Sequence, residues 1–331
     1  MSEPPPGPRP APAAPPPPAT VPPRWTLRYR AVYRYDRPAP RASLRIRLSI
    51  PEIPGWQRVL RRDLRVRPAP ARLGPGADAL GNAVEDLEVA GPFDEIAIEM
   101  EALVETVNTN PFAFRLPGER GRLPLRLDAD ERAAVSRFDP RPGTVPAPVH
   151  TPAATPPSDP VLEFGRRFAD EAKGDVFGLL AAMTRAIHRE FRFSWGVTNV
   201  QTAPEQVLAL RTGVCQDFTT LMIAAARRLG IPARYASGFV YDGPPERRRA
   251  GELGATHSWC EAYIPGIGWK GFDPTNGILV CHTHVFVAAG PDARSVTPVE
   301  GTTFGPGSNY CNVAVDVDPA EEDGRLPAQG P

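Results

Sequence analysis

The run Arg211-Thr-Gly-Val-Cys215-Gln-Asp-Phe218 places a cysteine between a turn and a helix. Before the cysteine, Thr212-Gly213 is typical of a tight turn. After it, apolar residues recur at three- and four-residue steps, which predicts an amphipathic helix that ends at Gly230. Cys215 should therefore lie in the first turn of this helix, where the macrodipole and the backbone N–H groups favour a thiolate.

A histidine and an aspartate follow at separations of 42 and 16 residues, which allow each to lie on its own element of one compact domain. His257 begins an alternating run that predicts a strand over 257–264, and Pro265-Gly266 forms the turn into a second strand, 268–273. A hairpin brings the end of its second strand back to the start of its first, so Asp273 can reach His257. Cysteine, histidine and aspartate in this order are the layout of a thiol nucleophile, its base and the group that orients the base.

Four runs together resemble the transglutaminase-like superfamily, specifically the bacterial transglutaminase-like proteins. They are Gly213-Val-Cys-Gln-Asp-Phe218, residues 229–238, the His-x-Trp-x-Glu-x-Tyr strand from His257 and the Trp-x-Gly-Phe-Asp-Pro-Thr-Asn-Gly run from Trp269. Near the N-terminus, Tyr33, Leu44, Gln57 and Asp78-x-x-Gly81-Asn82 are similar to the β-domain that precedes the core in this family. The resemblance implies a papain-like α+β core with Cys215, His257 and Asp273 as its catalytic triad, and no required cofactor.

Three more side chains are candidates for oxyanion or substrate contacts: Trp195, Gln216 and Trp259. Trp195 precedes the cysteine by 20 residues, and its indole N–H could assist an oxyanion; packing at a strand end is the alternative. Residues 242–256 lie directly before His257 and are interpreted either as a substrate-gating loop or as an ordinary connection.

The predicted class is α+β, an N-terminal antiparallel β-domain followed by a core in which the cysteine helix packs on an antiparallel sheet. The boundaries are a disordered tail over 1–23, the β-domain and a following segment over 24–138, a linker over 139–160, the catalytic domain over 161–317 and a second disordered tail over 318–331. The N-terminal tail, 1–23, contains 12 prolines and the linker contains 8, which disfavours a packed core in both segments.

Strands are expected in the β-domain at 25–35, 43–50, 59–66, 84–89 and 96–107. In the catalytic domain, helices should fill residues 161–191 with a break at 173–175, and His188 should be a surface residue. The strands of this domain are expected at 233–241, 257–264, 268–273, 284–288 and 312–317.

Composition excludes several other classes. The net charge is zero and 41% of residues are apolar, so neither a nucleic-acid surface nor a disordered chain is indicated. No apolar run has the length of a membrane span, and the N-terminus lacks a signal-peptide core, which predicts a cytoplasmic protein. The four cysteines show no C-x-x-C spacing that would indicate a zinc ribbon. In Cys281-His-Thr-His284, strand alternation would separate the cysteine from both histidines, so no metal is expected, and no EF-hand loop indicates calcium.

The favoured function is a thiol enzyme that attacks a peptide or protein amide through Cys215 and then hydrolyses the acyl-enzyme, as a peptidase or amidase. Transfer of the acyl group to an amine, as in a protein-glutamine γ-glutamyltransferase, uses the same triad and stays open. Arylamine-type acyl transfer shares the residue order but has no support elsewhere in the chain. A non-catalytic binding scaffold is the alternative of a different class, and the sequence gives no oligomeric state.

Overall fold

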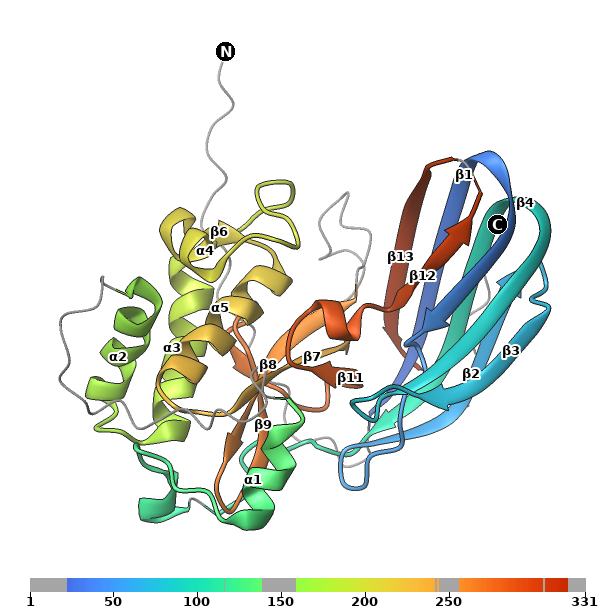
Figure 1. Cartoon of the computed structure of the whole chain (residues 1–331). Coiled ribbons are helices and arrows are strands. Elements are labelled where there is room, and N and C mark those ends of the chain that lie inside the picture. Colours follow the sequence, from blue (N-terminus) through green and yellow to red (C-terminus); the bar gives the residue numbers. More distant parts are fainter. Residues whose placement is uncertain are drawn as a thin grey trace.

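The computed structural model describes residues 23–115, 117–138, 159–241, 243, 256–305 and 307–320. A β-domain and a mixed α+β domain lie side by side (Figure 1). The described residues leave out 1–22 and 321–331 of the predicted tails, 139–158 of the predicted linker, and the predicted loop except residues 243 and 256. No helix within the described ranges is long and apolar enough to cross a membrane.

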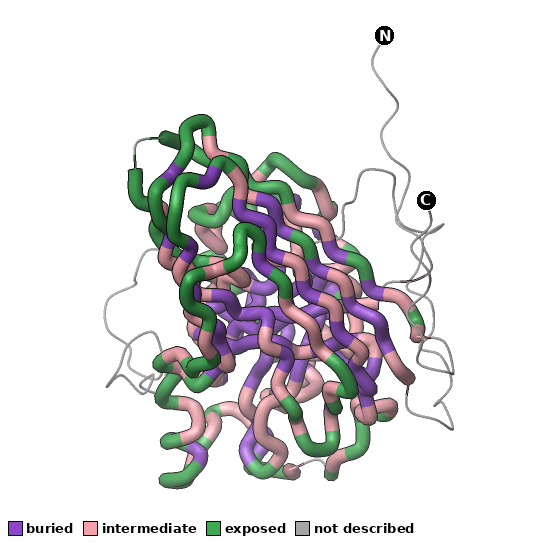
Figure 2. Tube along the Cα trace, turned by 90° about the vertical axis from the view of Figure 1, so that its right-hand side faces the viewer, coloured by how far each residue is buried: buried purple, intermediate pink, exposed green. Residues whose placement is uncertain are grey.

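Two long antiparallel strands, β1 (Arg24–Ile46) and β4 (Ala83–Thr106), form the centre of the β-domain. Each bends near its middle, so the paired strands run through two halves of one sheet. The first half of β1 lies between β13 (Asn309–Pro319) and β4, and β4 in turn pairs with β2 (Gln57–Arg67). The second half of β1 lies between β12 (Val299–Phe304) and β4, and β4 pairs there with β3 (Arg72–Ala77). Buried and exposed positions alternate along these strands (Figure 2).

The strand predictions were wrong in two respects. Segments 25–35 and 43–50 belong to one strand, β1, which ends at Ile46, and segments 84–89 and 96–107 likewise form β4. The register shifts between Arg34 and Arg41, where Pro38 and Pro40 cannot donate ladder hydrogen bonds, so the chain bends without leaving the sheet. The strand expected at 312–317 does not join the catalytic sheet, because β13 covers the edge of β1 from Trp25 to Tyr35.

Helices cover one side of the second domain. After a 3-10 turn (Gly118–Gly121) and α1 (Ala129–Ser136) come α2 (Pro160–Glu171), α3 (Val176–Glu190), α4 (Pro204–Leu210) and α5 (Cys215–Arg228). The expected break between α2 and α3 is confirmed, and the Asp175 carboxylate caps α3 by accepting the Gly178 N–H at 2.8 Å. The two-residue strands β5 (Arg192–Phe193) and β6 (Thr212–Gly213) pair in parallel beside the start of α5.

The helix that starts at Cys215 packs on an antiparallel sheet, as predicted. This sheet has the order β10-β9-β8-β7-β11 and consists of β7 (Ala233–Val240), β8 (His257–Ile264), β9 (Gly268–Asp273), β10 (Ile278–Leu279) and β11 (His284–Gly290). Strands β8 and β9 form the expected hairpin, with Ile264 opposite Gly268. The buried side of α5 presents Phe218, Leu221 and Met222 to this core.

Side-chain amides of the β-domain bind the outer edge of β11. The Gln57 side chain donates to the Phe286 carbonyl and accepts the Phe286 N–H, both at 2.8 Å. Asn82 does the same with Ala289 at 2.9 and 2.8 Å. Because each amide presents an N–H donor beside a carbonyl acceptor, as a residue of a neighbouring strand would, each side chain takes the place of one such residue. The β-domain therefore completes the sheet of the second domain at this edge.

Candidate active site

Cys215 is the first residue of α5 and is partly exposed. The turn before it is tight: a Cβ atom on Gly213 would lie 2.7 Å from Asp217 Oδ2, so only glycine fits there. The Asp217 carboxylate accepts the Val214 N–H at 2.7 Å and the Thr198 hydroxyl at 2.6 Å. These contacts fix the backbone on both sides of the thiol, as the predicted start of the helix at Cys215 requires.

His257 is the first residue of β8 and 7% exposed, and it lies near enough to the Cys215 thiol to affect the pKa of that thiol. Burial of the thiol raises its pKa, but the interaction with His257 outweighs burial and brings the pKa of Cys215 below its ordinary value. The pKa of His257 is raised in turn to about 10, because the attraction to Asp273, together with the influence of the nearby thiol, exceeds the opposing effect of burial. Both shifts favour a thiolate–imidazolium pair.

Asp273 ends β9 and is completely buried, with both carboxylate oxygens bonded. Its Oδ2 atom lies 2.8 Å from His257 Nε2, which confirms that the hairpin brings these two side chains together. Its Oδ1 atom accepts the backbone N–H groups of Thr275 and Asn276 at 2.9 and 3.1 Å. Burial alone would raise the pKa of this carboxyl, but the two histidines bring it far below its usual range, so the group is ionised.

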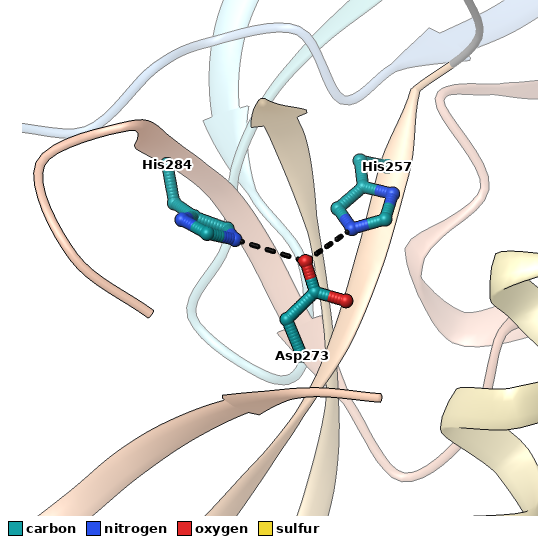
Figure 3. Close-up of side chains that lie close together, drawn as sticks. All are labelled: His257, Asp273 and His284. Atoms are coloured by element: carbon teal, nitrogen blue, oxygen red, sulfur yellow. Dashed lines mark hydrogen bonds and ion pairs between the residues drawn. The ribbon is translucent and has the colours of Figure 1, made fainter. Parts of the chain in front are cut away.

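A second histidine, His284 at the start of β11, shares the same oxygen. Its Nε2 atom lies 3.1 Å from Asp273 Oδ2, on the side away from His257 (Figure 3). The Asn276 side-chain amide donates to this oxygen as well, at 2.8 Å. The sequence interpretation did not assign His284 to the site, although a histidine at the start of a predicted strand, 11 residues after Asp273, was a usable signal.

The stretch Cys281–His284 is a turn before β11, so the expectation that strand alternation separates the cysteine from both histidines was wrong. The His284 N–H bonds the Cys281 carbonyl at 2.9 Å and closes the turn. The Cys281 thiol lies 3.5 Å from the Thr283 hydroxyl, and the nearby His282 and His284 outweigh burial and lower the pKa of Cys281 to about 5. Cys281 is only 6% exposed, which limits the access of any reagent to it.

Ligand atoms of His257, Asp273 and His284 lie within 4.8 Å of one another, close enough for a metal ion. The occupancy of the carboxylate argues against such a site, because Asp273 already accepts five hydrogen bonds, two of them from backbone N–H groups and one from an amide. A cation would have to replace the two histidine protons and share Oδ2 with the Asn276 donor. The donor set fits an ionised carboxylate held by hydrogen bonds better than a metal ligand.

The other candidate contact residues lie in different surroundings. Trp195 is 55% exposed and meets Phe193 edge-on, one strand away from the turn that precedes Cys215. Gln216 is partly exposed beside Cys215. Trp259 is completely buried and packs edge-on against His284 with 5.3 Å between ring centroids, so its ring supports the histidine cluster from inside the sheet. His188, expected at the surface, is partly buried and binds the Thr275 carbonyl through Nδ1 at 2.8 Å.

Comparison with known proteins gives two family matches. Residues 164–274 match the transglutaminase-like superfamily, and residues 25–105 match the bacterial transglutaminase-like N-terminal region. An uncharacterized protein of Mycobacterium tuberculosis is 29% identical over 320 residues, covering 91% of this chain and 94% of its own. One from Mycobacterium leprae is 27% identical over 287 residues, covering 86% and 95%. A solved structure from Cytophaga hutchinsonii, described as a candidate cysteine protease, has a TM-score of 0.63 at 22% identity and covers 92% and 93% of the two chains. This last likeness extends the shared fold over both domains.

Proposed function

Because the chain belongs to the transglutaminase-like superfamily, we propose that it is a thiol enzyme that cleaves an amide bond of a peptide or protein through Cys215. The observation that carries this proposal is the 2.8 Å bond from His257 to the buried Asp273, with Cys215 at the start of α5 near enough to His257 for its pKa to be lowered. This arrangement would supply a nucleophile at a helix N-terminus, a base near it, and a buried carboxylate that fixes the base.

In the first half of the reaction, the Cys215 thiolate attacks the carbonyl carbon of the amide. The oxygen takes up the electron pair, and backbone N–H groups in the first turn of α5 stabilise the oxyanion, with Trp195 as the side-chain candidate beside them. The His257 imidazolium then gives its proton to the departing nitrogen, the carbon–nitrogen bond breaks, and a thioester on Cys215 forms as the amine leaves. His257 Nε2 stays bonded to Asp273 throughout, which leaves Nδ1 for proton exchange.

In the second half, neutral His257 removes a proton from water as the water oxygen attacks the thioester carbon. Collapse of this second intermediate expels the Cys215 thiolate, restores the imidazolium and releases a carboxylic acid. We favour water as the acceptor because a chain with only Lys173 and Lys270 offers few amines for crosslinking to itself. An amine that attacked the same thioester would make the protein a transferase.

The test uses p-nitrophenyl acetate, a general acyl donor, with cadaverine present as a competing amine. We expect a burst of p-nitrophenolate, one acetyl group on Cys215 by intact-protein and peptide mass spectrometry, and release of acetate in preference to N-acetylcadaverine. The Cys215→Ala protein should give none of these. Cys311→Ala, which removes an exposed thiol on β13, is the matched control and should behave as wild type.

Three other results would each count against a different part of the proposal. An absence of both burst and acetylated Cys215 in a folded wild-type protein would reject the thiol enzyme altogether. Acetylcadaverine as the main product would keep the acyl-enzyme but replace hydrolysis by transfer. Equal acetylation of Cys311 and Cys215 would show that the thiol at the helix start has no special reactivity.

A further inference from the structure

His284 is fully buried and holds the Asp273 carboxylate from the side opposite His257, through Nε2 at 3.1 Å from Oδ2. We propose that His284 is a positioning residue of the reaction, which fixes Asp273 so that the carboxylate faces His257 in one orientation. This inference rests on the proposed function, since it assigns a role in the same site. His284 reaches the reacting thiol only through Asp273 and His257, so it is not itself a catalytic residue.

The contacts of His284 leave its ring little freedom. Trp259 packs against one side with its ring edge-on, and the Thr283 hydroxyl lies 3.1 Å from Nδ1. The carboxylate at Nε2 is ionised and can only accept, so Nε2 carries a proton in either charge state of the ring. A ring that is packed, bonded at both nitrogens and buried can hold a carboxylate more rigidly than a mobile side chain or a water molecule.

The β-domain fixes the strand on which His284 lies. Trp25 Nε1 and Thr106 Oγ1 donate to the His282 carbonyl at 2.9 and 2.7 Å, directly before the turn closes. Two residues beyond His284, the Gln57 side chain pairs with both backbone groups of Phe286. The backbone on both sides of His284 is thus bound by residues of the first domain, which gives that domain a structural connection to Asp273.

The direction of the expected effect follows from the charges. His284 donates to Asp273 and helps to keep the buried carboxylate ionised. The carboxylate raises the pKa of His257, and His257 lowers the pKa of Cys215. Without the His284 donor the carboxylate can turn away from His257, which weakens this attraction, so the pKa of Cys215 should move upward, toward the ordinary value of about 8.5. Among the described residues, the ionisable groups near this cluster include Tyr235 on β7, Asp217 on α5, Cys281 and His282 on the turn, and His188 on α3.

The experiment compares His284→Gln with His284→Asn, two neutral amides that differ in reach. A glutamine amide nitrogen falls near the position of Nε2 and can still donate to Asp273, whereas an asparagine amide ends near Nδ1 and cannot. The readout is the rate of Cys215 alkylation by iodoacetamide as a function of pH, followed by peptide mass spectrometry. We expect the midpoint to stay near wild type in the glutamine variant and to rise by about one pH unit in the asparagine variant.

A control on the same turn separates positioning from general disturbance. His282→Gln changes a buried histidine that has no bond to Asp273 and should keep the wild-type midpoint. Equal midpoints for the glutamine and asparagine variants, whether shifted or not, would overturn the proposal, because the reach of the donor would then have no effect. A wild-type midpoint at or above about 8.5 would instead reject the proposed function, since no lowered thiol pKa would exist to be maintained.

Discussion

The two histidines that share Asp273 belong to regions of the molecule with different neighbours. His257 starts β8 and lies near the partly exposed thiol of Cys215, so its surroundings lie inside the α+β domain. His284 starts β11, is completely buried, and lies on a strand whose outer edge is bound by the β-domain. The Asp273 carboxylate is therefore held on one side by His257, the group with which it would act. On the other side it is held by His284, whose strand is bound by the β-domain.

This difference gives the β-domain a role that its surface does not indicate. It contributes no residue to the Cys215–His257–Asp273 series, yet Gln57 and Asn82 occupy positions that a neighbouring strand would take. Asn82 is itself fixed by Asp78, which accepts its side-chain amide at 2.9 Å and its backbone N–H at 2.9 Å. The buried Arg47 in turn bonds Asp78 at 3.0 Å. A series of polar contacts thus extends from the interior of one domain to the active-site sheet of the other.

Asp273→Asn changes the contacts with both histidines, His257 and His284, and should have the largest effect. An asparagine amide has one acceptor oxygen, so it cannot accept from the histidines and from the backbone N–H groups of Thr275 and Asn276 together. His257 then loses its fixed tautomer, and we expect the rate of Cys215 acylation to fall by about 10⁴-fold. The pH profile should narrow as well. Without the carboxylate, the pKa of His257 falls from about 10 and the pKa of Cys215 rises, so the thiolate–imidazolium pair exists over a smaller range.

The measurement is the p-nitrophenolate burst rate between about pH 5 and pH 10, a range that extends beyond the ordinary pKa values of histidine and cysteine on both sides. Far-UV circular dichroism shows whether the variant folds. A folded variant with the wild-type rate and an unchanged profile would remove Asp273 from the proposed mechanism. A variant that loses rate but keeps both limbs of the profile would show that the carboxylate acts on something other than the proton equilibrium of the pair.

The positions of Cys215, His257 and Asp273 could be predicted from local sequence patterns. The apolar period after Cys215 defines α5, and the Pro265-Gly266 turn defines the hairpin that places Asp273 2.8 Å from His257. Each of these inferences needs only residues that are close in sequence, or one turn whose geometry is known. The papain-like class was implied by the resemblance of these runs to the transglutaminase-like superfamily, not by the local patterns alone.

The surroundings of His284 and the contacts between the β-domain and β11 could not be predicted in this way. Strand alternation was applied to Cys281–His284, but the bond from the His284 N–H to the Cys281 carbonyl makes a turn there and brings the cysteine back to the histidines. The contacts of Gln57 with Phe286 and of Asn82 with Ala289 join residues more than 200 positions apart, and no local pattern encodes such pairs. The return of β13 to β1 escaped for the same reason, since alternation shows that a segment is a strand and not which sheet it joins.

Gln57→Leu and Asn82→Leu test the contacts between the β-domain and β11. Each change removes an amide and leaves a backbone N–H and a carbonyl of β11 without their partners, which should lower the free energy of unfolding by about 1–3 kcal/mol. Urea unfolding measured by tryptophan fluorescence gives this value. If β11 also carries the position of His284, Gln57→Leu should raise the midpoint of Cys215 alkylation more than Asn82→Leu, because Phe286 is closer to His284 than Ala289 is. Destabilisation without any shift in that midpoint would separate the fold of the edge from the chemistry of the site.

Arg30→Ala changes the β-domain away from β11 and should have the smallest effect. The Arg30 side chain is 56% exposed and bonds Glu99 at 3.1 Å, while Arg67 bonds the same carboxylate oxygen at 2.7 Å. Since Glu99 keeps a cationic partner and the pair is open to solvent, we expect a loss of no more than about 0.5 kcal/mol in the free energy of unfolding. The alkylation midpoint of Cys215 should equal that of the wild type. A shift comparable with that of Gln57→Leu would mean that any change in the β-domain alters the pKa of Cys215. The contacts at the edge of β11 would then not be what connects the two domains.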